Sequence, residues 1–368
     1  YYVAYVMGRE GTIQWVNLGD AKKIETEITA LREALADPAR VDVRGIAHQL
    51  YKRVFAPIRP FVRDVVGLLI APDGDLSLIP LGTLVDERDQ FLIQRFAFSY
   101  LTSGRDLLRL SVRDTPRSGA VIFANPQYDA DSTPKVPVGA RRTRGMRARA
   151  LGKVAWTPLP ATAKEAQLLV SNIPGATTYV GSAATEGAVK AVNGPWLMHV
   201  ATHGFFLSDT AASPSVGSAT ENPLLRSGLV FSGANHLRSG TDDGVLTALE
   251  AATLDLRGTQ MVVLSACETG VGAIDRGEGV QGLRRALIVA GSESQVMSLW
   301  QVDDDATQGL MQGMYKHLLS GKERAISLQR VKRAMLRSEE YSHPYYWGAF
   351  IASGRWDAMR AWKRASER

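Results

Sequence analysis

Residues 261–279 read MVVLSACETGVGAIDRGEG and include Cys267, the single cysteine of the 368-residue chain. Residues 261–266 form a short apolar run, and the cysteine stands where this run meets a loop rich in glycine and acid. The pattern is typical of a buried parallel strand that ends in a polar turn. Ligands of open α/β sheets bind in the crevice outside the carboxyl ends of the strands, so the position of the thiol suggests reactivity.

A second apolar run, residues 196–202, ends in the same way with His203 and Gly204, and His203 precedes the cysteine by 64 residues. If the two strands are parallel neighbours, an imidazole and a thiol face each other across their ends. A nearby histidine activates a thiol by taking its proton or by stabilising the thiolate. We therefore predict that Cys267 is a nucleophile and His203 its base. The alternatives are a small buried cysteine and a structural histidine.

Five segments occur in an order that resembles the CHAT domains of the caspase and separase clan. They are HVATHGFF (199–206), VVLSACETG (262–270), GEGVQGLRRALIVAG (277–291), SLWQVDDDAT (298–307) and HPYYWGAF (343–350). The resemblance implies a cysteine endopeptidase with a caspase-like three-layer α/β/α sandwich and a mainly parallel central sheet. The caspase signature Q-A-C-[RQG]-G is matched only loosely around Cys267. We therefore expect a relative of caspases and not a caspase with a preference for aspartate.

Amide hydrolysis through an acyl-enzyme needs donors for the negative oxygen that forms. The backbone N–H groups of Gly204 and Cys267 are the predicted oxyanion hole, an arrangement that the resemblance also implies. In this clan the strand ending in SLWQV borders the pocket for the residue before the cut bond, and separases, which cut after arginine, carry an acid at the position of Asp304. We predict that Asp304 binds a basic side chain, with Asp303 and Glu268 beside it in the substrate site. Alternatively, these acids cap the next helix, with Asp305 as the capping residue.

The alternation of strands and helices in the second half predicts right-handed βαβ units and a mainly parallel sheet covered on both faces. We divide the chain into an N-terminal α/β region, 1–115, and an active protease domain, 116–368. The resemblance implies that the first region is a catalytically empty caspase-like half; the alternative is an extension of a single domain. Locally, we expect a strand at 76–79, a capping box formed by Thr162 and Glu165, and a core position for His199.

The composition is that of a globular protein, with 45% hydrophobic residues. A single cysteine excludes an internal disulfide framework and favours a reducing compartment, and the sequence contains no run of about 18 apolar residues that could cross a membrane. We therefore expect a cytoplasmic protein without membrane contact. One cysteine and scattered histidines give no metal-ligand spacing, so we expect no metal and no cofactor.

The net charge of +6 arises from one segment. Residues 135–153 carry seven basic residues and no acid, and the rest of the chain is close to neutral. Because this segment lacks aromatic residues interleaved for base stacking, we do not expect nucleic-acid binding. We interpret it as an exposed loop and a candidate site of self-cleavage for a protease that prefers arginine. The alternative is a solvated charged linker.

The expected partner is a protein substrate bound as an extended strand. The chain starts without methionine inside a predicted strand, so we expect it to continue a longer protein. The resemblance implies an upstream helical-repeat or sensor region, or an activating partner, and a regulated role in bacterial signalling or defence. Two other functions remain open: a catalytically silent scaffold for protein interaction, and a cysteine hydrolase or transferase acting on a small molecule.

Overall fold

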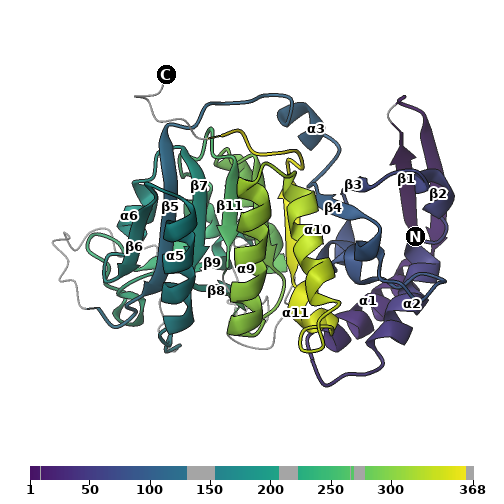
Figure 1. Ribbon diagram of the computed structural model, residues 1–368, viewed down its shortest axis with the longest axis horizontal. Helices are drawn as coiled ribbons and strands as arrows, with labels where there is room; N and C mark the ends of the chain where they lie inside the picture. Colours follow the sequence, from purple (N-terminus) through teal and green to yellow (C-terminus); the bar gives the residue numbers. More distant parts are fainter. Residues whose placement is uncertain (9, 131–153, 207–222, 266, 269–277, 362–368) are drawn as a thin grey trace, which may run out of the picture.

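The computed structural model describes residues 1–8, 10–130, 154–206, 223–265, 267–268 and 278–361. The basic segment 135–153 lies outside these ranges. A sheet of eight strands forms the centre, in the order β3-β4-β14-β13-β11-β7-β5-β6 (Figure 1). Neighbouring strands are parallel except β13 and β14. The predicted mainly parallel sheet is confirmed. In chain order the strands are β3 Gly67–Ile70, β4 Ala97–Tyr100, β5 Ser118–Pro126, β6 Thr177–Gly181, β7 Pro195–Ala201, β11 Met261–Leu264, β13 Ser294–Ser298 and β14 Phe350–Gly354.

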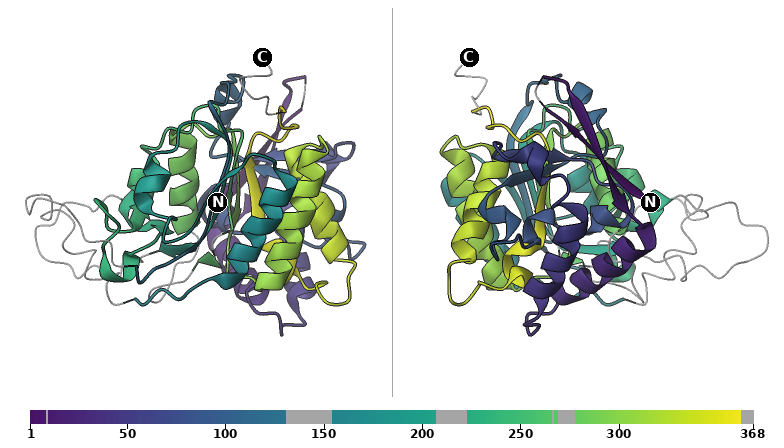
Figure 2. Two further views of the ribbon diagram at one scale, coloured as in Figure 1. Left: turned by 60° about the vertical axis from the view of Figure 1, so that its left-hand side comes forward. Right: turned by 90° about the vertical axis from the view of Figure 1, so that its right-hand side faces the viewer.

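Helices cover both faces of this sheet, as the alternating pattern predicted. Figure 1 shows α5, α9 and α10 in front of it, and the left view of Figure 2 shows α6 and α8 on the opposite side. Strands between two helical layers are shielded from solvent on both faces, and every residue of β7, β11 and β13 is buried, including the polar side chains of β13. The helices are α5 Pro160–Asn172, α6 Glu186–Lys190, α7 Ala248–Ala251, α8 Glu278–Val289, α9 Asp304–Leu319 and α10 Arg324–Met335.

A second, four-stranded sheet, in the order β10-β9-β8-β12, extends the chain beyond the ends of β7 and β11. Its strands are β8 His203–Phe206, β9 Ser227–Val230, β10 Val245–Thr247 and β12 Cys267–Glu268. β8 follows β7 after one residue, and β12 follows β11 after two. β8 and β12 are parallel, whereas β8 with β9 and β9 with β10 are antiparallel. Both predicted reactive residues therefore begin strands at the carboxyl edge of the central sheet.

The first residues form a hairpin and two helices at the β3 edge of the molecule (Figure 1). The hairpin pairs β1 Tyr2–Met7 with β2 Ile13–Gly19, and α1 Ala21–Leu35 and α2 Val43–Val54 follow. β3 and β4 then join the central sheet, because Tyr100 of β4 pairs with Ser353 of β14. The region before residue 115 thus contributes two strands to the common sheet. Its assignment as a catalytically empty caspase-like half, and the division at 115, stay predictions.

The remaining elements are short: α3 Asp106–Arg109, α11 Pro344–Gly348, and 3-10 helices at Arg59–Val62, Gly74–Leu78, Leu81–Thr83, Leu92–Gln94, Pro223–Leu225 and Ala234–His236. The strand predicted at 76–79 is wrong, because the chain turns tightly from Gly74, which has a positive φ of 55°, into a 3-10 helix. Among the described residues, no helix has both the length and the apolar character needed to span a bilayer.

The capping box predicted for Thr162 and Glu165 is also wrong. α5 begins two residues earlier, at Pro160, a residue favoured in the first helical turn. The Thr162 hydroxyl donates to the carbonyl of Leu159 at 2.7 Å and accepts from the backbone N–H of Asn125 at 2.9 Å. It therefore ties α5 to the end of β5. The side chain of Glu165 is buried and points into the protein, where it belongs to the site described below.

Candidate active site

The backbone brings the two predicted reactive residues side by side. β7 and β11 are adjacent parallel strands, with Val200 opposite Leu264. The register continues into the second sheet, where His203 pairs with Cys267 and Gly204 with Glu268. Paired strands lie about 4.8 Å apart. The side chains of Cys267 and Glu268 lie outside what the structure describes, so their roles and that of the Gly204 N–H stay predictions.

The imidazole of His203 is buried, with 4% of the residue exposed, and two aromatic rings enclose it. The ring centroids of Tyr128 and Trp156 lie 5.2 and 5.6 Å from its own. Nε2 of His203 is 2.8 Å from the carbonyl oxygen of Thr157. A carbonyl only accepts, so this contact places the ring proton on Nε2 and leaves the lone pair on Nδ1. Within the described part of the chain, Nδ1 is buried and has no hydrogen-bond partner.

The electrostatics of His203 suit a base. Burial lowers the pKa of the imidazole from its ordinary value, while the hydrogen bond to Thr157 and the negative charge of Asp304 oppose this shift. Burial disfavours the charged form of a histidine and so favours the neutral ring. A neutral imidazole with a free Nδ1 can accept a proton from a neighbouring thiol.

The three aspartates after β13, residues 303–305, take different positions at the start of α9. Asp303 is the N-cap of α9, and its carboxylate accepts from the backbone N–H of Ala306 at 3.0 Å. The prediction that Asp305 is the cap is therefore wrong: the backbone of Asp303 is non-helical, with φ −53° and ψ 138°, as a cap requires, and α9 begins at Asp304.

Asp304 is exposed in the first turn of α9. Its pKa is raised by partial burial and by the charges of Asp303, Asp305 and Glu165, whereas His203 lowers it. The charges of Asp304 and His203 therefore act on each other. This places the predicted specificity residue at the same edge of the sheet as the predicted base.

A buried polar cluster lies behind this edge. His199 on β7 is fully buried, as predicted, and its Nδ1 is joined to the hydroxyl of Tyr315 on α9 by a hydrogen bond of 2.9 Å. Its Nε2 faces Oε1 of Glu165 on α5 at 3.2 Å. Oε2 of Glu165 accepts from the hydroxyl of Ser265 at 3.1 Å. We call these four residues the Glu165 cluster.

Sequence reasoning missed the residues that hold His203. Thr157 and Trp156 lie in the irregular segment before α5 and carry no motif. Tyr128 offered one signal, because it follows β5, and β5 is the parallel neighbour of β7. Its hydroxyl accepts from the backbone N–H of His203 at 3.3 Å. No group of three or more His, Cys, Asp or Glu side chains within the described ranges is arranged to hold a metal.

The sequence model of the CHAT domain family matches residues 44–355. Among curated proteins, the chain is similar to tetratricopeptide repeat protein 28 of Homo sapiens, with 26% identity over 312 residues, and of Mus musculus, with 25% over 306. Each alignment covers 78% of this chain and 12% of the relative, so the chain spans a small part of these proteins.

Two solved structures are also similar to the chain. The Arg-specific cysteine proteinase gingipain R (RgpB), of Porphyromonas gingivalis, has 13% identity and a TM-score of 0.45, covering 92% of this chain and 76% of that one. Separase in the Saccharomyces cerevisiae separase–securin complex has 11% identity and a TM-score of 0.45, covering 95% and 21%.

Proposed function

Because the chain belongs to the CHAT domain family, we propose that it is a cysteine peptidase with Cys267 as its nucleophile and His203 as its base. The observation that carries the proposal is the register of β8 and β12, in which the backbones of these two residues are paired at the carboxyl edge of the central sheet. This is the edge at which α/β proteins bind ligands.

In the proposed reaction, the thiol of Cys267 gives its proton to Nδ1 of His203, and the sulfur attacks the peptide carbonyl. The N–H groups of Cys267 and Gly204 would stabilise the negative oxygen. The C–N bond then breaks, the protonated imidazole gives its proton to the leaving amine, and a thioester remains. Water, deprotonated by the same imidazole, hydrolyses the thioester. The contact with Thr157 supports this scheme because it keeps the proton on Nε2 and leaves Nδ1 basic.

We further propose cleavage after arginine or lysine, with Asp304 as the residue that binds the basic side chain. Asp303 and Asp304 are both exposed, but Asp303 already uses its carboxylate as a helix cap. Partial burial and then the neighbouring negative charges raise the pKa of Asp304, and a cationic ligand would relieve the repulsion. A guanidinium can also pair with a carboxylate through two hydrogen bonds. Glu268 stays a predicted contact of the substrate, as does binding of the substrate as an added strand.

The test uses fluorogenic peptides with Arg, Lys, Leu or Asp before the reporter, incubated with the wild type and with Cys267→Ala. The proposal predicts cleavage of the Arg and Lys peptides by the wild type alone. Cleavage that persists in Cys267→Ala would remove the mechanism. A wild type that cleaves no peptide but binds a protein partner would support a silent scaffold instead.

Self-cleavage of the basic segment 135–153 is a further proposal. Five of its seven basic residues are arginines, which the proposed specificity would accept. The intact masses of the wild type and Cys267→Ala after incubation decide the matter, because equal masses would exclude self-cleavage.

We also propose that helical repeats accompany this domain in the full-length protein. The support is the name of the similar mammalian proteins, of which the chain covers 12%. A cytoplasmic location and a role in bacterial signalling or defence stay predictions, and the curated relatives named above come from human and mouse.

A further inference from the structure

The Glu165 cluster places a carboxylate inside the protein without a lysine or arginine contact in the described structure. Glu165 is 5% exposed and His199 is fully buried. The hydroxyl of Ser265 donates to Glu165, and Nε2 of His199 faces the other carboxylate oxygen at 3.2 Å without the alignment of a hydrogen bond. Burying a carboxylate costs free energy of desolvation, so an apolar side chain at this position would hold α5 on the sheet with a smaller loss of stability. The position of this carboxylate therefore calls for another explanation.

Each contact of the cluster leads to one segment of the proposed active site. Ser265 directly follows β11 and lies two residues before Cys267 in the chain. His199 lies on β7, the strand that runs into β8 and His203. Tyr315 lies on α9, whose first residue is Asp304. These three segments are far apart in sequence, and the cluster joins them to α5 in one place.

We propose that Glu165 is a positioning residue: through Ser265 it fixes the approach of the Cys267 segment to His203, and through His199 and Tyr315 it fixes β7 and α9 in the same arrangement. This inference rests on the proposed function. Glu165 touches neither substrate nor reacting atoms in this scheme. Its effect is on geometry, and a displacement of about 1 Å at reacting groups can lower a rate by about a hundredfold.

The single cysteine gives a direct readout. Cys267 is the only thiol that iodoacetamide can alkylate, so the rate of mass increase against pH, after subtraction of the rate of Cys267→Ala, reports the activation of this one thiol. In the wild type, we expect the midpoint of alkylation to lie below the value of about 8.5 for a free thiol. In Glu165→Gln, which keeps the size of the side chain, we expect the midpoint to move toward that value. We also expect kcat for an Arg peptide to fall about ten- to hundredfold, with a smaller change in KM.

The matched control is Glu293→Gln. Glu293 is also a buried carboxylate, with 6% of the residue exposed, and it contacts Arg324 at 3.1 Å and Arg355 at 3.3 Å. It precedes β13, a strand parallel to β11, and so lies at the amino edge of the sheet, opposite Cys267. This variant should lower the thermal midpoint and leave both the alkylation midpoint and kcat at the wild-type values.

Two milder variants keep the test decisive if Glu165→Gln does not fold. Ser265→Ala and Tyr315→Phe each remove one hydroxyl of the cluster. Both should shift the pH midpoint of alkylation in the same direction as Glu165→Gln, but by a smaller amount. A wild type that cleaves peptides, with folded cluster variants that keep its alkylation midpoint and kcat, would overturn the inference and leave the proposed function intact. A wild type with an ordinary thiol profile and no cleavage would instead overturn the proposed function and the positioning role with it.

Discussion

His203 and Lys332 each bury a basic nitrogen, but their surroundings differ. His203 lies at the carboxyl edge of the sheet, paired in register with Cys267 and influenced by the charge of Asp304. Lys332 lies on α10 and is also buried, at 5% exposure. Burial lowers the pKa of both side chains, in Lys332 to about 7. A perturbed pKa by itself therefore does not identify a reactive site.

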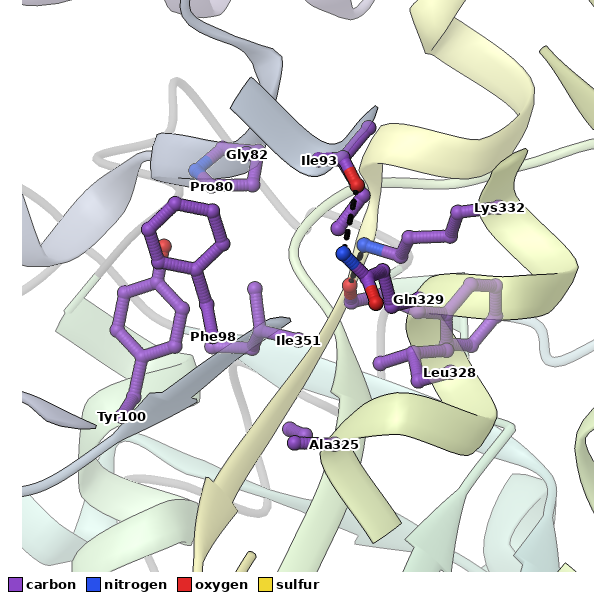
Figure 3. A pocket seen from close by; sticks show the side chains of 12 residues that line it. Pro80, Gly82, Ile93, Phe98, Tyr100, Ala325, Leu328, Gln329, Lys332 and Ile351 are labelled. Atoms are coloured by element: carbon purple, nitrogen blue, oxygen red, sulfur yellow. Dashed lines mark hydrogen bonds between the residues drawn. The ribbon is translucent and has the colours of Figure 1, made fainter. Parts of the chain in front are cut away.

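The surroundings of the two nitrogens make the difference. Figure 3 shows Lys332 and Gln329 on α10, with Gln329 reaching toward the carbonyl oxygen of Ile93 beside a small cavity. Lys332 donates to the carbonyl oxygen of Phe350. The cavity has about 20 Å³, room for one water, and most of its lining is apolar. Burial alone shifts the pKa of Lys332, whereas Thr157 and Asp304 also act on His203. We expect Lys332 to be a structural amine whose burial lowers stability, and we infer that the position of His203 at the end of a strand distinguishes the candidate site.

The largest effect expected is that of His203→Ala. Without its base, the enzyme should lose about a thousandfold or more in kcat/KM for an Arg peptide at pH 7. The residual rate should rise with pH up to about 9, because the thiolate must then form unaided. His236→Ala, at an exposed histidine, is the control. Wild-type activity in His203→Ala would show that His203, like Lys332, is a buried basic residue without a catalytic role.

Lys332→Met tests the other region. The unfolded lysine holds its proton up to a pKa near 10.5 and the folded one only up to about 7, so the unfolded state binds more protons between these values. The free energy of unfolding of the wild type should therefore rise with pH across this window, by at most about 1.4 kcal/mol per unit from this group. The variant should be more stable than the wild type by roughly 1–3 kcal/mol at pH 7, since the lost bond to Phe350 offsets part of the gain.

Denaturant titrations of both proteins at pH 6.5, 8 and 9.5 provide the measurement. The difference in free energy of unfolding between Lys332→Met and the wild type should become smaller as the pH rises. For Arg330→Met, at an exposed position of the same helix, this difference should not change with pH. A stability difference that does not change with pH would mean that Lys332 stays charged in the folded protein.

Asp304→Asn sharpens the description of the candidate site. Removing the carboxylate should lower kcat/KM for an Arg peptide by about ten- to hundredfold relative to a Leu peptide, because the guanidinium of the substrate would lose its charged partner. Asp305→Asn, one residue later in the same helical turn, should leave the ratio near that of the wild type. Equal losses in the two variants would show that the acids act only through their combined charge.

The smallest effect expected is that of Tyr128→Phe. The phenol bonds the backbone of His203 and lies 3.0 Å from the hydroxyl of Thr202, so its loss should lower the free energy of unfolding by about 1 kcal/mol and kcat by a few-fold. Tyr179→Phe is the matched control, because that ring stacks on Phe123 away from His203. A larger loss of activity than in Asp304→Asn would give Tyr128 a more direct role.

The sequence by itself determined the sheet, its helical layers and the family. Apolar runs that end in His203 and Cys267 predict strand ends because buried parallel strands are mostly apolar and polar residues are favoured where such a strand ends. The ordered motifs made the resemblance specific, and the match over residues 44–355 confirms it. The preference for Asp at a helix N-cap did not identify the capping residue where two aspartates could fill this role, as with Asp303 and Asp305 at the start of α9.

Only the tertiary structure decided where the buried polar groups find partners. Glu165 was expected to cap its own helix, yet it bonds Ser265, 100 residues later. Thr157 and Trp156 contact His203 from a segment without a motif. The sequence patterns of helices and strands depend on contacts between residues that are close together in the chain. The partner of a buried side chain depends on which distant elements pack together, and that choice is made by the whole core.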